Sequence, residues 1–120
     1  MKDSFDQWVK LHRLCVADLP RYGDFPAVYA IRHSTTQDVL KYGNAGRLHQ
    51  RIFGNFIGGV GGSTTQRVHC ELCSNGMIDC AEVAWIETKD KAEAEGMEKR
   101  FRQQYKRAHD GRRPIWDRQD

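Results

Sequence analysis

Apolar residues recur at near-helical spacing in three parts of the chain. The first covers residues 4–18 and begins with the form of a capping box. The second covers residues 47–56, and the third follows Thr88 or Asp90 as its cap and extends to Gly111. The apolar positions are Phe5, Trp8, Val9, Leu11, Leu14 and Cys15; Leu48, Ile52, Phe53 and Phe56; Ala94, Met97, Phe101, Tyr105 and Ala108. We predict a helix in each part.

Short β-prone segments lie between these stretches. Residues 27–32 and 39–43 flank a polar run, which predicts a hairpin with a loop of more than two residues. Residues 67–73 and 80–88 are two further β-prone pieces, of which the second alternates apolar and polar positions more regularly. The order helix, hairpin, helix, strand, helix indicates an α+β fold in which helices pack on a small sheet.

Length and composition limit the classes of protein that the chain can represent. The 120 residues suit one domain, and 39% hydrophobic with 29% charged residues is typical of a globular protein. No apolar run of about 18 residues occurs, and the N-terminus lacks the apolar stretch of a secretory signal. We therefore expect no membrane association and a cytoplasmic location, where the four cysteines remain free thiols.

The net charge is only +3, but the basic residues are unevenly distributed. Residues 99–113 carry seven of them against the single acidic residue Asp110: Lys99, Arg100, Arg102, Lys106, Arg107, Arg112 and Arg113. Such a block is a candidate phosphate-facing surface, and a solvated helix face is the alternative.

Four features occur in a specific order and spacing. Ala27-Val28-Tyr29 lies in the first predicted strand of the hairpin, Lys41-Tyr42-Gly43 in the second, Arg51 eight residues past the glycine and Glu98 in the last helix. This arrangement resembles the GIY-YIG nuclease superfamily over about residues 25–114. The resemblance implies one nuclease domain over residues 1–120. Its core would be a three-stranded, mainly antiparallel sheet flanked by helices, here with an extra N-terminal helix.

The resemblance also implies an activity and a set of catalytic residues. It implies a DNA endonuclease that hydrolyses phosphodiester bonds with Mg²⁺ or Mn²⁺. Tyr29 would act as the base, Arg51 would stabilise the phosphate and Glu98 would bind the metal, with Lys41 and Tyr42 in the second motif. The sequence departs from the family at Lys41, where the motif begins with tyrosine, and at Asn55, where many members have histidine. It also lacks the asparagine that follows Pro114 in many relatives.

The residue types suit this chemistry on their own terms. Helical spacing places Glu98 on the inward stripe of the last helix, where a carboxylate must be paired or bind a metal. A single carboxylate completed by water suits Mg²⁺, while contact with solvent or with Lys41 is the alternative for Glu98. The guanidinium of Arg51 complements a phosphate. The ordinary pKa of tyrosine is about 10, so Tyr29 would need a nearby cation, and we expect Lys41 to provide it.

In the nuclease interpretation, six basic residues would bind the phosphates of DNA: Arg47, Arg100, Lys106, Arg107, Arg112 and Arg113.

Other interpretations of the sequence remain open. A catalytically inactive DNA-binding or interaction module of the same fold is one alternative. A small zinc-stabilised domain is the other, with His69, Cys70, Cys73 and Cys80 as ligands. The sequence decides neither the preferred DNA nor the oligomeric state.

Overall fold

The computed structural model describes residues 4–11 and 24–117. The described residues form one antiparallel sheet of four strands, ordered β1-β4-β2-β3. The strands are β1 (Val9–Lys10), β2 (Ala27–His33), β3 (Val39–Ala45) and β4 (Ala81–Glu87). The predicted α+β class and the hairpin of β2 and β3 are confirmed. The sheet has four strands instead of three, because β1 pairs with β4.

The predicted N-terminal helix over residues 4–18 is wrong where the structure describes it. Val9 pairs with Val83 in an antiparallel ladder, and the ring of Phe5 lies 4.6 Å from that of Phe101. These apolar side chains pack against two parts of the sheet instead of forming one helical stripe. Over so short a segment, the spacing of apolar residues does not distinguish a helix from a strand. Residues 12–18 of the prediction lie outside the described residues.

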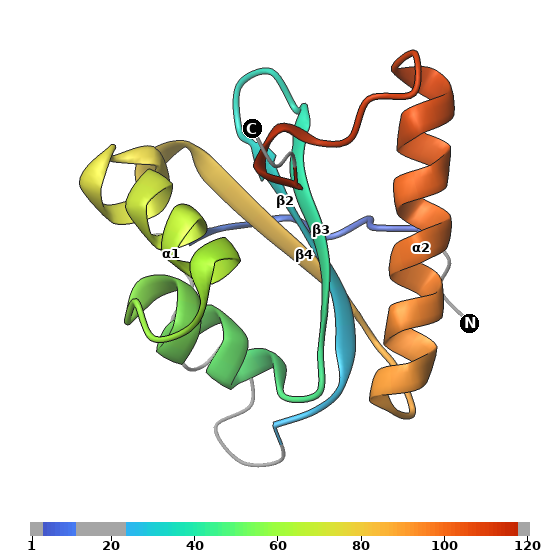
Figure 1. The fold of residues 1–120 in the computed structure, drawn as a ribbon, viewed down its shortest axis with the longest axis horizontal. Helices are drawn as coiled ribbons and strands as arrows, with labels where there is room; N and C mark the ends of the chain where they lie inside the picture. Colours follow the sequence, from blue (N-terminus) through green and yellow to red (C-terminus); the bar gives the residue numbers. More distant parts are fainter. Residues whose placement is uncertain (1–3, 12–23, 118–120) are drawn as a thin grey trace.

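Helices cover both faces of the sheet (Figure 1). One face carries a π-helical segment η2 (Gln50–Ile57), α1 (Ser63–His69) and η3 (Cys70–Ser74), and the other carries α2 (Lys91–Ala108). Short 3-10 turns precede β4 and follow α2, as η4 (Met77–Cys80) and η5 (Ile115–Asp117).

The two later helix predictions are confirmed in type and position. The predicted helix over residues 47–56 corresponds to η2 and the residues just before it, and it ends at Gly58. The Asp90 side chain caps α2 by accepting a hydrogen bond from the Glu93 amide at 2.8 Å.

The predicted strand over residues 67–73 is wrong, since this stretch belongs to α1 and η3. Val68 and Leu72 are buried, whereas Cys70 and Cys73 are exposed. Burial of two residues four positions apart follows the helical period, so packing overrides the β propensity of the segment.

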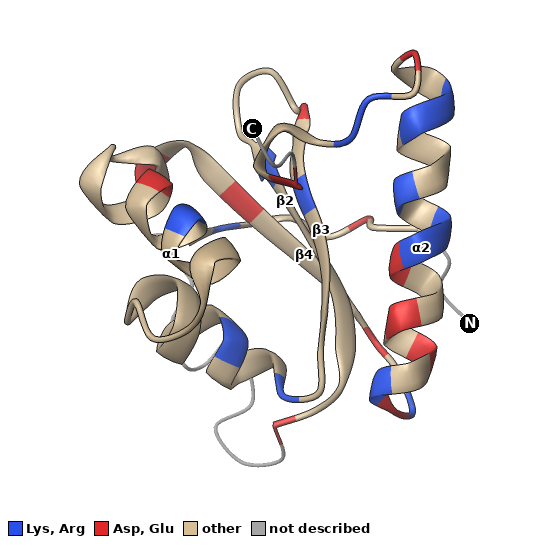
Figure 2. Ribbon diagram, in the orientation of Figure 1, with Lys and Arg blue, Asp and Glu red and all other residues tan. Residues whose placement is uncertain are grey.

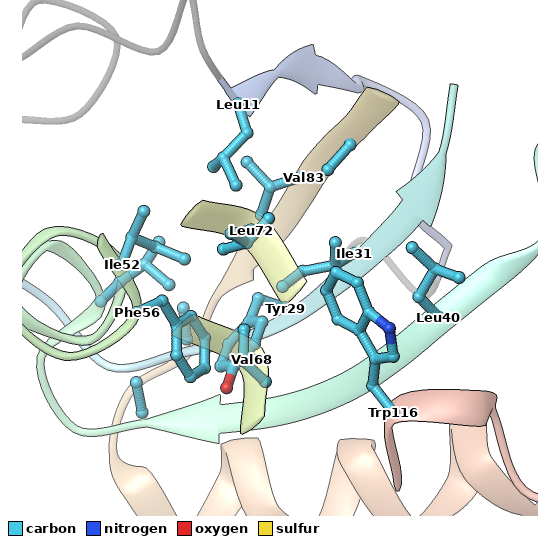
Figure 3. Packing of buried hydrophobic residues seen from close by; sticks show 14 residues of the cluster. Leu11, Tyr29, Ile31, Leu40, Ile52, Phe56, Val68, Leu72, Val83 and Trp116 are labelled. Carbon is cyan, nitrogen blue, oxygen red and sulfur yellow. The ribbon is translucent and has the colours of Figure 1, made fainter. Parts of the chain in front are cut away.

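Each face of the sheet has its own hydrophobic cluster. The cluster under η2, α1 and η3 contains Tyr29, Phe56 and Trp116, among the side chains drawn in Figure 3. The cluster under α2 contains Tyr42 and Phe101. Because β3 is the last strand of the sheet order, its outer edge lies between these two helical layers.

Candidate active site

Tyr29 lies at the centre of the sheet and reaches across its edge strand. It pairs with Gly43 of β3, and its ring packs edge-on against Phe56 with the ring centroids 5.8 Å apart. A Cβ atom at Gly43 would overlap the Cζ and hydroxyl of Tyr29. The phenol therefore lies directly over the Gly43 backbone, which carries its hydroxyl to the outer edge of β3.

Replacing Gly43 should disturb both stability and the site. Gly43→Ala should lower the free energy of unfolding by about 1–3 kcal/mol, because the added methyl group overpacks against a buried ring. Urea unfolding followed by tryptophan fluorescence measures this loss. Gly96→Ala on α2 is the matched control, since a Cβ there meets no atom within 4 Å. That control should stabilise the protein by about 0.4–1 kcal/mol. Equal stability of the two variants would contradict the placement of the Tyr29 ring.

Charged residues from η2, α2 and η5 act electrostatically on the Tyr29 hydroxyl. Burial raises the pKa of Tyr29 well above its ordinary value, and the nearby Arg51 guanidinium opposes this rise. Glu98 and Asp117 raise the same pKa further, whereas Arg102 lowers it. The hydroxyl has no hydrogen-bond partner among the described residues. The fold thus gathers three of the residues singled out by the sequence, Tyr29, Arg51 and Glu98, around one edge of β3.

Glu98 is held in place by two donors. Its Oε1 accepts a hydrogen bond from Asn44 Nδ2 at 2.9 Å, and its Oε2 accepts one from Arg102 Nη2 at 3.0 Å. Asn44 follows Gly43 on β3, on the face covered by α2. The carboxylate is therefore partly buried against the sheet edge. It is bound by Asn44 and Arg102 and not by Lys41.

Arg51 comes from η2, on the other side of the β3 edge. Its side chain is partly exposed, and no carboxylate among the described residues forms an ion pair with it. A guanidinium that no described carboxylate neutralises, beside a buried phenol, is suited to an anionic ligand.

Lys41 does not provide the cation that we expected beside Tyr29. Its Nζ forms an ion pair with Asp117 Oδ1 at 2.9 Å, and the two side chains are 8% and 4% exposed. The second Asp117 oxygen accepts a hydrogen bond from the Tyr42 amide at 3.2 Å. The cations that oppose the rise in the pKa of Tyr29 are Arg51 and Arg102 instead. The physical reason is that η5 brings a buried carboxylate against β3, and this carboxylate neutralises Lys41.

Tyr42 lies on the opposite face of β3 from Tyr29 and Lys41. Its ring packs with those of Phe101 and Tyr105, with centroids 5.9 and 6.2 Å away. Burial raises the pKa of Tyr42 as well. Tyr42 is therefore a core side chain under α2 and does not face the Tyr29 hydroxyl.

Three residues at this edge were missed by reasoning from the sequence. Arg102 could have been found, because it lies four residues after Glu98 on a helix, the spacing of an ion pair. Asn44 is adjacent to the second motif. Asp117 has only an indirect signal: a buried lysine on a strand requires an anion, but nothing in the spacing shows where that anion lies.

The basic residues expected to bind DNA are spread over several surfaces. The Arg47 side chain is 70% exposed and lies 3.6 Å from Asp24 Oδ2. Figure 2 shows positive residues along the second half of α2 and the segment that follows it. Of these residues Lys106 is partly buried, and the others are exposed: Arg100, Arg107, Arg112 and Arg113.

Asn55, where the sequence resemblance led us to look for a histidine, supports a glycine-rich loop. Its Nδ2 donates to the Val60 carbonyl at 2.6 Å, and Gln66 Nε2 donates to the Gly59 carbonyl at 2.6 Å. The two amides hold the loop between η2 and α1, so the role of Asn55 in this chain is structural.

The possible zinc ligands are not brought together. His69 Nδ1 lies 2.9 Å from the Phe56 carbonyl, and Cys73 Sγ lies 3.9 Å from the Ile57 carbonyl. Cys70, Cys73 and Cys80 are free thiols. Over residues 4–11 and 24–117, no group of three or more His, Cys, Asp or Glu side chains is placed to hold a metal ion.

Comparison with known proteins finds no match to a family model, to a curated protein or to a solved structure. Within the described residues, none of the helices combines the length and apolar character needed to span a bilayer.

Proposed function

We propose that this protein is a metal-dependent endonuclease that hydrolyses phosphodiester bonds in DNA. The observation that supports the proposal is that Glu98 bonds Asn44 of β3, the Tyr29 phenol lies over the neighbouring Gly43, and Arg51 and Glu98 both act electrostatically on the Tyr29 hydroxyl. They combine a hydroxyl, a cation that no carboxylate of residues 4–11 and 24–117 pairs with, and a carboxylate. These are the groups needed to handle a proton, neutralise a phosphate and bind a divalent ion.

Glu98 and Asn44 are the residues that would hold the divalent ion. Both offer oxygen, since the Asn44 side chain uses its nitrogen to bond Glu98 and leaves its carbonyl oxygen available. Mg²⁺ prefers oxygen ligands and is commonly held by one or two carboxylates, substrate phosphate and water, so this donor set fits. When bound, the ion would polarise the phosphate and stabilise the leaving oxygen.

Arg51 would bind the scissile phosphate. Its fork of donors matches two phosphate oxygens, and the charge that develops in the transition state strengthens this contact. DNA on either side would be held by Arg47 and the basic residues of α2 and the following segment, through salt-sensitive contacts that do not read sequence.

Tyr29 would accept the proton of the attacking water, and its pKa sets the expected pH dependence. Since burial raises this pKa, the phenol is protonated at neutral pH and its active, ionised fraction grows with pH. We expect the cleavage rate to rise about tenfold per pH unit from neutral pH up to at least about pH 9, below the ordinary tyrosine pKa. Tyr29→Phe should be slow and nearly independent of pH over the same range. A plateau near pH 7 in the native protein would contradict Tyr29 as the base.

The proposal is tested by incubating the purified protein with supercoiled, branched and single-stranded DNA in Mg²⁺, in Mn²⁺ and in EDTA. We expect cleavage of at least one substrate with either metal and none in EDTA. DNA binding without cleavage under any of these conditions would contradict it.

A second candidate, a DNA-binding module without catalytic activity, is favoured by the pairing of charges in the site. Lys41 is neutralised by Asp117, and both Glu98 oxygens already accept hydrogen bonds. The same DNA panel separates the two candidates, because the second predicts retention of DNA with no metal-dependent products.

A further inference from the structure

Arg102 occupies the centre of the charged groups at the β3 edge. Its Nη2 donates to Glu98 Oε2 at 3.0 Å and to the Tyr42 carbonyl at 3.5 Å, a distance at the outer limit for a hydrogen bond. Its Nε lies 3.8 Å from Asp117 Oδ2. The guanidinium therefore bridges two carboxylates, and among the described residues its shortest polar contact is with Glu98.

The contacts of Arg102 are incomplete. Its Nε is buried and has no hydrogen-bond partner in the part of the chain that the structure describes, although the side chain carries a full charge. A buried donor without a partner destabilises the arrangement that contains it. Asp117 depends little on Arg102, because it is already bound by Lys41 and by the Tyr42 amide. If another cation bound Glu98, Arg102 could therefore be released, and both Glu98 and Asp117 would still have partners.

We propose that Arg102 is a built-in counter-ion that competes with the divalent cation for Glu98. This inference rests on the proposed function, because it assumes that Glu98 binds the metal. With Asn44 on Oε1 and Arg102 on Oε2, a cation can reach the carboxylate only by displacing or crowding a donor. A dication and a guanidinium on the same oxygen repel each other. Arg102 therefore lowers the metal affinity of the free protein.

The freed guanidinium has a second role in the same site. Its Nη2 lies 3.5 Å from the carbonyl oxygen of Tyr42, the residue before Gly43, over which the Tyr29 phenol packs, so it is also near the place where the scissile phosphate would bind. A DNA phosphate that attracts Arg102 would remove the competitor from Glu98. Metal and DNA would then each strengthen the binding of the other.

The direct test is the affinity of the full-length protein for Mn²⁺ without DNA, measured from the electron paramagnetic resonance signal of the free ion. Arg102→Met removes the charge and keeps an apolar stem. We expect it to bind Mn²⁺ about 3- to 10-fold more tightly than the native protein, the range set by loss of one charge-assisted contact. Lys99→Met, at an exposed position of the same helix, is the control for loss of a positive charge, and it should change the affinity by less than about twofold.

The outcomes separate this inference from the proposed function. Equal affinities of the native protein and Arg102→Met, or equal gains in Arg102→Met and Lys99→Met, would overturn the role of Arg102 alone. Tighter binding that Glu98→Gln abolishes in the Arg102→Met background would support it. If neither the native protein nor Arg102→Met binds Mn²⁺, both the inference and the metal site are wrong. Thermal unfolding of each variant confirms that it is folded.

Discussion

Glu98→Gln should lower the rate of DNA cleavage by a factor of about 100 or more while leaving the fold and the DNA affinity intact. The amide keeps the size of the side chain and an oxygen for the Asn44 hydrogen bond, but it lacks the charge that holds a divalent ion. DNA affinity should be equal or slightly higher, because one negative charge near the phosphate is removed. Single-turnover cleavage rates over a range of Mg²⁺ concentrations, with DNA binding measured separately, give both quantities.

Glu95→Gln is the matched control on the same helix. Glu95 is exposed on α2, so its replacement removes an equal charge outside the site. We expect cleavage by this variant to remain within about twofold of the native rate. A native rate in Glu98→Gln at low Mg²⁺, or an equal loss in both variants, would remove Glu98 from the proposed site.

Arg51→Met should also reduce cleavage by a factor of about 100 to 1,000, the usual loss when a group that stabilises transition-state charge is removed. DNA affinity should fall only slightly, since the other basic residues on α2 and in the segment after it would still bind the phosphate backbone of DNA. The separation of rate from affinity is the signature of a catalytic arginine, as opposed to one that only binds phosphate.

Arg47→Met provides the comparison for Arg51. Arg47 precedes it by one helical turn and is largely exposed. Its loss should weaken DNA binding and reduce the salt dependence of binding by about one phosphate contact, with little change in the rate at saturating DNA. The assignment of Arg51 would be wrong if the two variants behaved alike.

Much of the fold could be predicted because local signals were consistent with it. The hairpin of β2 and β3, the helix that ends at Gly58 and the helix capped by Asp90 each have a clear period and a clear boundary. β1 could not be predicted, since a two-residue strand exists only through its pairing with β4. The helical segment from α1 to η3 was missed because β-prone residues were placed in a helix by the burial of Val68 and Leu72.

The candidate site was predictable only in part for a similar reason. Spacing and family resemblance identified Tyr29, Arg51 and Glu98, and the fold brings them to one edge. The pairing of Lys41 with Asp117 joins residues 76 positions apart, which no local pattern reveals. This pairing changes the electrostatics of the site, because it leaves Arg51 and Arg102 as the cations that act on Tyr29.

We propose that one metal-dependent site at the β3 edge cuts DNA. The most direct test is a single assay that compares nicking of supercoiled DNA by the native protein, Glu98→Gln and Arg51→Met, each with Mg²⁺ and with EDTA. We predict nicking by the native protein with Mg²⁺ alone and a loss of at least about a hundredfold in both variants. Absence of nicking by the native protein, or nicking that persists in both variants, would contradict the claim.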